Sequence, residues 1–375
     1  MMTAHVHVPG PRSRVAVRRS SDRHTNDNGD IEDPGATPAA SGVEGIEDGI
    51  TRTGGSVVAV TTEAVQPRSD SRAATRSPRR GPSHRRRTTM TAYLFILPMI
   101  IGVAVFMIYP LASSAYHAFT KWDGLSPATW DGLANFRYML FEDPTFWPSL
   151  RATAYFVLLS VPSSIVFGLA LAVLLNRMIV GVKIFRTIFY LPVVLPSIAV
   201  LTLWKYIYDP LYGLANQLLT ALNLPTSQWL QSERMAMPSI VIIGIWGVGG
   251  SMIIFLAGLQ NVPTEVYEAA RTDGAGPVRM FFSITLPLIT PIMLLQVVLG
   301  LVLAFQAFNQ VAVLTNGGPG TSTMLFMYKI YTDAFGSYPN LGLATAEALV
   351  LFVIIMIITG ITLKTSSMWV FEETK

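Results

Sequence analysis

The stretch TAYFVLLSVPSSIVFGLALAVLL, Thr153 to Leu175, contains no charged residue over its whole length. A helix of about 20 residues is long enough to cross the roughly 30 Å hydrocarbon core of a bilayer. A central Asp, Lys or Arg costs about 2.5–3.5 kcal/mol on insertion, so a charge-free run of this length is typical of a membrane-spanning helix. The stretch therefore predicts an integral membrane protein.

Five further apolar runs of similar length occur in the chain. They cover residues 92–116, 187–208, 239–259, 292–314 and 343–363. Only Glu347 places a carboxylate inside one of these runs, and Lys205 lies near the end of another. Six such helices would be difficult to keep in solution as the core of a soluble protein. We therefore expect an all-α membrane protein with six transmembrane helices.

The composition divides the chain into two parts. Of 375 residues only 13% are charged, and 51% are hydrophobic, whereas soluble domains carry about 25% charged residues. Residues 1–90 are rich in Arg, Ser and Pro and show no periodic pattern, so we predict a disordered cytoplasmic tail there. We expect a membrane domain over 91–375, with its core at about 150–365. The chain has no cysteine, which excludes disulfides and zinc–thiolate sites.

Basic residues predict the orientation of the helices. Six arginines lie within residues 76–89, and the connection 176–186 carries Arg177, Lys183 and Arg186 without an acid. Cytoplasmic connections are enriched in Lys and Arg. The amino terminus is therefore expected in the cytoplasm, and an even number of helices returns the carboxyl terminus to the same side. Because the basic excess belongs to the tail, it gives no reason to expect nucleic-acid binding.

The connection between the fourth and fifth runs, residues 260–290, predicts two short helices. Pro263-Thr264-Glu265 is typical of a helix start, since threonine can cap and an acid suits the positive end. Gly274 can end that helix in a left-handed conformation. Gly276-Pro277 then opens a second helix, because proline is tolerated in the first turn. Pro287 and Pro291 are expected to stop it before the fifth run.

Two interpretations of this connection follow from its residue types. Small and charged side chains share the first helix, namely Glu268, Ala269, Ala270 and Asp273. An apolar set follows, namely Val278, Phe281, Phe282 and Ile284. An apolar face of this size is not expected to stay in water. It would serve either as a docking element for another protein or as an amphipathic connector lying on the lipid.

The pattern Glu268-Ala269-Ala270, then Gly274, then Ile284-Thr285-Leu286-Pro287 resembles the EAA loop of permease subunits of ABC importers. The resemblance extends over about residues 92–365. Tyr190-Leu191-Pro192 and the stretch 313–320, VLTNGGPG, are similar to sugar permeases of the MalF/UgpA type. Asn309 stands where relatives often carry an aspartate, so the resemblance leaves the solute open.

The resemblance implies the transmembrane domain of a type I ABC importer in a bacterial plasma membrane. The solute would be a sugar or oligosaccharide, or alternatively a glycerol phosphate or polyol, delivered by an extracytoplasmic binding protein. A second, MalG-like permease subunit and two ATPase subunits would complete the transporter. The resemblance assigns ATPase coupling to the EAA loop residues Glu268, Ala269, Ala270, Asp273, Gly274, Ile284, Leu286 and Pro287.

The sequence gives no reason to expect catalysis by this chain. It contains no Gly-x-x-x-x-Gly-Lys-Ser/Thr motif, so ATP hydrolysis is expected on a separate subunit. It also lacks the motifs of membrane-embedded hydrolases, and we predict neither a cofactor nor a metal site. A secondary carrier driven by protons or sodium remains an alternative, although such carriers usually hold ionisable groups near the bilayer midplane.

Four polar residues are candidates for the solute pathway. Gln306, Asn309 and Gln310 have the spacing that places side chains on one face of a helix. Glu347, near the start of the sixth run, is expected at a similar depth. Amides and a carboxylate are suitable hydrogen-bond partners for sugar hydroxyls. The alternative is that these groups bond between helices and hold the bundle together.

Overall fold

The computed structural model describes residues 82–177 and 181–371, and within them the chain is almost entirely helical. The only strands in these ranges are two short ones, β1 (Thr120–Lys121) and β2 (Thr129–Trp130), which pair antiparallel. The predicted all-α class is confirmed. The predicted tail falls mostly outside the described residues, and its last part, residues 82–90, is the beginning of a helix.

Three helices in the described part are long and apolar enough to span a membrane without a break. The first is α1 (Pro82–Val103), which continues through a π-helical turn, η1 (Ala104–Ile108), into α2 (Tyr109–His117). The others are α4 (Phe146–Leu175) and α16 (Leu341–Ser366). They match the first, second and sixth predicted runs.

The other three predicted runs correspond to bent pairs of helices. α5 (Val182–Val194) meets α6 (Ser197–Ile207) at 98°, and α8 (Ala236–Trp246) meets α9 (Gly249–Gln260) at 48°. The segment Pro277–Leu288 meets α13 (Thr290–Phe305) at 66°. If each bent pair is one span, the described residues contain the six spans that the sequence predicts.

Each bend has a local cause. Pro196 lacks an N–H group and forces Leu195 into an extended conformation, which separates α5 from α6. Pro192, by contrast, lies inside α5 without ending it. Gly247 and Val248 separate α8 from α9. Glycine favours such a break because it loses less free energy than other residues when it leaves the helical conformation.

The fifth run differs from its prediction as one continuous helix. α13 ends at Phe305, and a separate short helix, α14 (Asn309–Leu314), follows. Outside the connection 260–290, the remaining short helices of the described residues are α3 (Ala134–Phe141), α7 (Leu214–Ala221), η2 (Trp229–Gln231) and α15 (Phe326–Phe335).

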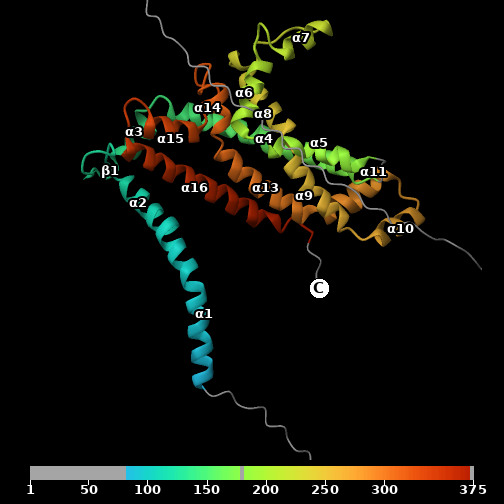
Figure 1. Cartoon of the computed structure of the whole chain (residues 1–375), viewed down its shortest axis with the longest axis horizontal. Helices are drawn as coiled ribbons and strands as arrows, with labels where there is room; N and C mark the ends of the chain where they lie inside the picture. Colours follow the sequence, from blue (N-terminus) through green and yellow to red (C-terminus); the bar gives the residue numbers. More distant parts are fainter. Residues whose placement is uncertain (1–81, 178–180, 372–375) are drawn as a thin grey trace, which may run out of the picture. The chain divides into compact units, whose positions relative to one another are not determined.

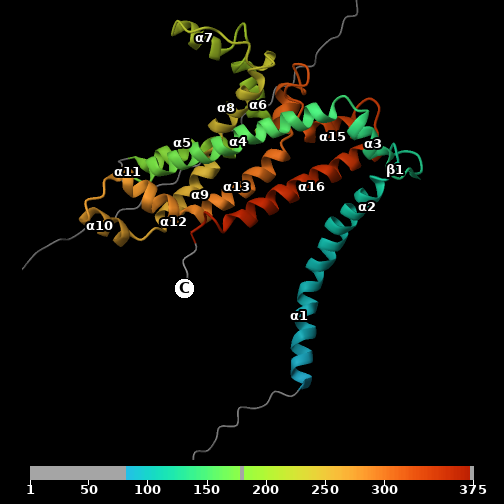
Figure 2. The same cartoon turned by 180° about the vertical axis from the view of Figure 1, so that it is seen from behind.

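Helix α4 is the centre of the packed bundle, with α8, α9, α13 and α15 against it (Figures 1 and 2). Gly168 lets α9 approach closely, since a side chain at this position would meet Ser251 of α9 and Val248 just before that helix. Beside it the hydroxyls of Ser164 and Ser251 lie 3.2 Å apart. Small residues and hydroxyl pairs at helix contacts are typical of membrane bundles, where lipid supplies no hydrophobic force between helices.

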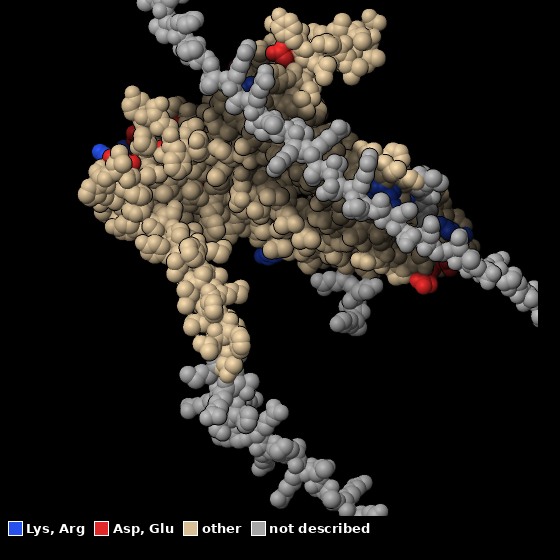
Figure 3. Space-filling model, viewed as in Figure 1, with Lys and Arg blue, Asp and Glu red and all other residues tan. Residues whose placement is uncertain are grey.

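Helix α1 leaves the packed bundle (Figures 1 and 2), and the apolar window of its span has no buried residue. Its continuation α2 packs on α16. On the face in Figure 3, most visible charged side chains gather towards the two ends of the bundle, with broad uncharged surface between them. That distribution is expected of a protein whose middle lies in hydrocarbon.

Candidate functional site

The EAA loop, residues 260–290, forms a short helix, a sharp turn and a second helical segment. Helix α10 (Thr264–Thr272) starts after Pro263, as predicted, but the Thr264 side chain does not cap it. Gly274 adopts φ +76° and ends the helix region in the left-handed conformation, as predicted. The second segment runs through α11 (Pro277–Met280), the π-helical turn η3 (Phe281–Thr285) and α12 (Leu286–Leu288).

The second segment ends at Leu288, between Pro287 and Pro291, as these prolines predicted. Pro287 lies within the first turn of α12, and the chain bends at Ile289 before α13 begins at Thr290. Pro291 lies in the first turn of α13, where proline is tolerated.

A side-chain hydrogen bond holds the two parts of the EAA loop together. The Tyr267 and Thr285 hydroxyl oxygens lie 2.9 Å apart, and Thr285 is buried. Tyr267 and Phe281 also pack against a buried cluster that includes Val262 and Leu259. The loop is thereby fixed to the ends of α4 and α9, so a force on α10 would be transmitted to the bundle.

The predicted coupling residues divide into two groups by exposure. Glu268, Ala269, Asp273 and Gly274 are exposed, whereas Ala270, Ile284, Leu286 and Pro287 are partly buried. The exposed group can contact another protein, and the partly buried group supports the loop.

A hollow of about 540 Å³ lies between the end of α4 and the EAA loop. Arg177 and Arg271 contribute to its lining, together with the polar side chains of Asn176 and Gln260. Exposed acids on α10 and these two arginines give this end of the molecule charges of both signs, which suits recognition of a partner by complementary charges.

The predicted alignment of Gln306, Asn309 and Gln310 on one helix face is wrong. Gln306 follows the last residue of α13, and Asn309 and Gln310 start α14, so the three residues do not share a continuous helix. Gln306 and Asn309 are exposed and Gln310 is partly buried. A solute role for these three residues stays a prediction.

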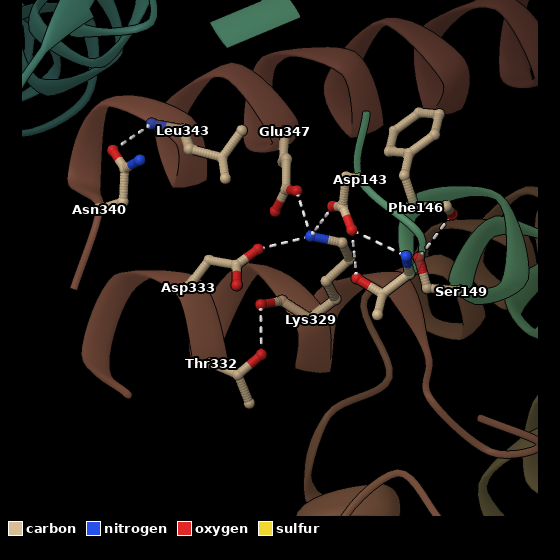
Figure 4. A network of polar contacts seen from close by, with 10 residues as sticks. Asp143, Phe146, Ser149, Lys329, Thr332, Asp333, Asn340, Leu343 and Glu347 are labelled. Atoms are coloured by element: carbon tan, nitrogen blue, oxygen red, sulfur yellow. Dashed lines mark hydrogen bonds and ion pairs between the residues drawn. The ribbon is translucent and has the colours of Figure 1, made fainter. Parts of the chain in front are cut away.

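Glu347 lies in a buried ionic cluster that the sequence did not predict (Figure 4). Its Oε1 lies 2.5 Å from the Lys329 ammonium, and both side chains are almost fully buried. The same ammonium lies 2.7 Å from Asp143 Oδ2 and 2.5 Å from Asp333 Oδ2. Of the two interpretations of Glu347, this geometry supports an interhelical contact.

The cluster joins three parts of the chain. Asp143 precedes α4, Lys329 and Asp333 lie one turn apart on α15, and Glu347 belongs to α16. The Phe326 N–H at the start of α15 also donates a 2.7 Å hydrogen bond to the buried Thr153 hydroxyl of α4. The i,i+4 spacing of Lys329 and Asp333 was the available sequence signal, but nothing in the sequence connected either residue with Glu347.

Charge interactions in the cluster shift two pKa values outside the spans. Burial alone would lower the pKa of Lys329, but the Glu347 charge and the hydrogen bonds to Asp143 and Asp333 raise it overall. Burial opposes ionisation of Asp143, yet hydrogen bonds from Lys329 and Thr145 hold its pKa below the ordinary 3.8. The three carboxylates are close enough together to bind a cation, and the Lys329 ammonium contacts all three.

These features define a helical membrane protein that spans the bilayer several times and presents a packed two-helix loop at one end. The chain belongs to the family described as binding-protein-dependent transport system inner membrane component, which matches residues 164–372. It is therefore a permease subunit of an ABC importer. The family that the sequence resemblance indicated is confirmed.

Relatives with curated names are similar over most of their own length. The probable ABC transporter permease protein YesP of Bacillus subtilis is 38% identical over 77% of this chain and 94% of its own. The sulfoquinovosyl glycerol transport system permease protein SmoG of Agrobacterium fabrum is 34% identical, over 73% and 90%. The sn-glycerol-3-phosphate permease protein UgpA of Yersinia pestis is 32% identical, over 72% and 91%.

A solved structure supports the fold. A chain of a bacterial alginate ABC transporter, crystallised with an alginate pentasaccharide-bound periplasmic protein, superposes with a TM-score of 0.66. Its sequence identity is 24%, and the match covers 75% of this chain and 95% of that chain.

Proposed function

We propose that this subunit forms part of the membrane pathway for a sugar-type solute. Relatives named for a sulfosugar glycerol conjugate and for starch degradation products support this class. A glycerol phosphate is the alternative, since UgpA is named for that solute. The exposed amides of Gln306 and Asn309 are suited to either, because amides can both donate and accept hydrogen bonds.

We further propose that the EAA loop couples the subunit to a separate ATPase. The observation that carries this proposal is the exposure of Glu268 and Asp273 on a loop fixed by the Tyr267–Thr285 hydrogen bond. An exposed carboxylate can pair with a basic residue of a partner, and a fixed loop can transmit the partner's movement.

The proposed orientation places the EAA loop and both termini in the cytoplasm. The Phe371 N–H donates a 2.9 Å hydrogen bond to Thr290 Oγ1, so the end of the described chain lies beside the EAA loop. Arg177, from the basic connection after α4, lines the same hollow as Arg271 of α10. Basic residues at this end support a cytoplasmic location.

We also propose the partner subunits that membership of this family implies. A second permease subunit, two ATPase subunits and an extracytoplasmic binding protein would complete the transporter. The apolar face of α1 is exposed in the single chain, which is consistent with a further membrane subunit or lipid around it.

Copurification and transport together test the proposal. The tagged chain is expressed with the ATPase, permease and binding-protein genes of its host and reconstituted in liposomes. We expect an ATPase to copurify, and ATP inside the liposomes to drive uptake of labelled maltotriose or sn-glycerol 3-phosphate. Uptake that follows a proton or sodium gradient without ATP would instead show a secondary carrier.

A further inference from the structure

An apolar groove of about 680 Å³ lies between α4 and the second segment of the EAA loop. The residues that line it from α4 are spaced three and four apart, so they share one face of that helix, namely Val166, Ala170, Val173 and Leu174. The facing wall comes from the second segment, with Phe281, Phe282 and Leu286. Phe281 and Phe282 belong to the apolar set for which the residue types allowed two interpretations.

The groove runs along the part of α4 that lies in hydrocarbon. From Ile165 to Leu175 the helix rises about 15 Å, which is half of the roughly 30 Å hydrocarbon core. The walls are open, since Val166 is 62% exposed and Phe282 is 61% exposed. A soluble ATPase does not reach this depth, so the occupant of the groove is either lipid or another membrane subunit.

The groove ends in a basic hollow. Arg177 and Phe281 line both the groove and the hollow of about 540 Å³ beside the EAA loop, so the two spaces adjoin. Arg271 of α10 also lines the hollow, and the described residues that line the two spaces include no carboxylate. The combined site therefore offers an apolar wall as long as one leaflet and two guanidinium groups at its end.

Charge distinguishes the two candidate occupants. In the orientation proposed above, this end of α4 lies in the cytoplasm, where membrane helices usually carry Lys or Arg. A helix of a partner subunit would thus meet Arg177 with like charge. An anionic phospholipid has the opposite charge at that level, and basic pockets between membrane helices bind such headgroups. Arginine also pairs with phosphate through two parallel hydrogen bonds.

We propose that an anionic phospholipid binds at this site, with an acyl chain in the groove and its phosphate at Arg177 and Arg271. The second segment of the EAA loop then lies against lipid, whereas the exposed acids Glu268 and Asp273 stay available to the ATPase. The two interpretations of the connection thus apply to different parts of it. Because Arg177 follows α4 and Arg271 belongs to α10, the bound headgroup joins the EAA loop to the bundle.

Photocrosslinking of lipids to the assembled transporter tests the site without a label on the protein. The transporter is reconstituted in liposomes of equal parts phosphatidylglycerol and phosphatidylcholine, and only one of the two lipids carries a diazirine in its acyl chain. Cross-linked peptides are quantified by mass spectrometry. Ile357 and Ile361 of α16 are the reference, because they are 52% and 58% exposed, close to the 62% of Val166 and the 50% of Leu174.

We expect phosphatidylglycerol to cross-link to the groove about five- to twentyfold more than phosphatidylcholine, the scale of one or two basic residues beside an anionic lipid. Both lipids should label α16 equally. Equal labelling of the groove by both lipids would show that the headgroup is not selected and overturn the proposal. No cross-link from either lipid would show that a membrane subunit covers the groove, and would equally overturn it. Neither outcome bears on solute transport or ATPase coupling, so failure here differs from failure of the proposed function.

Arginine substitutions test the headgroup site. Arg177→Gln and Arg271→Gln should each lower the preference for phosphatidylglycerol by up to about fivefold, whereas Arg177→Lys keeps the charge and should retain most of the preference. Lys183→Gln is the matched control, because it removes a charge from the same connection but lies outside the lining of both spaces.

Two further results would overturn the site. An equal loss of preference for Lys183→Gln would indicate attraction by the general surface charge. Loss of the preference in inorganic phosphate, with ionic strength matched by chloride, would assign the two arginines to a free anion.

Discussion

The Lys329 ammonium lies 2.5 Å from Glu347 Oε1, and the two side chains are only 2% and 0% exposed. Each charge has lost its hydration and depends on the other for compensation. Removal of one partner from a buried pair leaves an uncompensated charge, which is far more costly than the net value of the intact pair.

Lys329→Met tests this dependence. It leaves three carboxylates without their cation, so we expect a loss of about 3–5 kcal/mol in unfolding free energy, measured as a lower thermal midpoint in detergent. Lys205→Met is the matched control, because Lys205 is exposed and surface changes usually stay within about 0.5 kcal/mol. The double variant Lys329→Met/Glu347→Gln should recover part of the loss. Equal thermal midpoints for Lys329→Met and Lys205→Met would contradict a stabilising role for the ionic cluster.

The cluster also predicts how stability depends on pH. The pKa of Asp143 is lower in the folded state than its ordinary 3.8, so its contribution is present above that pH and is lost as pH falls through the folded pKa. The pKa of Lys329 is raised above 10.5, so its contribution is complete below that pH and is lost as pH rises through the folded pKa. Thermal midpoints should therefore decline at both extremes. Asp143→Asn should remove part of the acid-side decline, and an unchanged profile would contradict the assignment.

Glu268→Lys tests the coupling role of the EAA loop. If Glu268 pairs with a basic residue of the ATPase, as we propose, reversal of its charge should weaken docking by about 2–5 kcal/mol. We expect the ATPase to be lost on purification and uptake to fall, while membrane insertion stays normal. Glu233→Lys makes the same change at another exposed glutamate and should preserve both. Normal uptake by Glu268→Lys would count against the docking role.

Gly274→Ala tests the shape of the loop. The residue adopts φ +76° with open space around it, so an added methyl group meets no neighbour and the cost is backbone strain of about 1–2 kcal/mol. Gly276→Ala is the control, because that glycine has φ −73° and also faces open space. ATPase activity stimulated by the binding protein should fall for Gly274→Ala and not for Gly276→Ala. Gly274→Asn should retain most activity, since asparagine tolerates the left-handed region.

Tyr267→Phe removes the hydrogen bond that joins the two parts of the EAA loop. The expected loss is about 0.5–1.5 kcal/mol, the net value of one hydrogen bond. We expect faster amide hydrogen exchange in α10 and weaker coupling of ATP hydrolysis to uptake. Tyr212→Phe alters a tyrosine that is 81% exposed and should change neither measurement. Unchanged exchange in α10 would show that the loop is rigid without this bond.

The sequence by itself determined the membrane class and the outline of the EAA loop. Both depend on local chemistry: runs of about 20 uncharged residues are needed to cross hydrocarbon, and proline and glycine act on their own backbone. For that reason the start of α10 after Pro263 and the left-handed Gly274 were predictable. The end of the second segment at Leu288, between Pro287 and Pro291, follows from the same local rules.

The tertiary structure alone decided which distant residues meet. Lys329 and Glu347 are 18 positions apart, and Asp143 lies in a different part of the chain, so no periodic pattern connects them. The end of α13 at Phe305 likewise separated polar residues that a continuous helix would have aligned. Local sequence determines what each segment can bury, whereas the pairing of buried charges follows from the packing of helices that are remote in the chain.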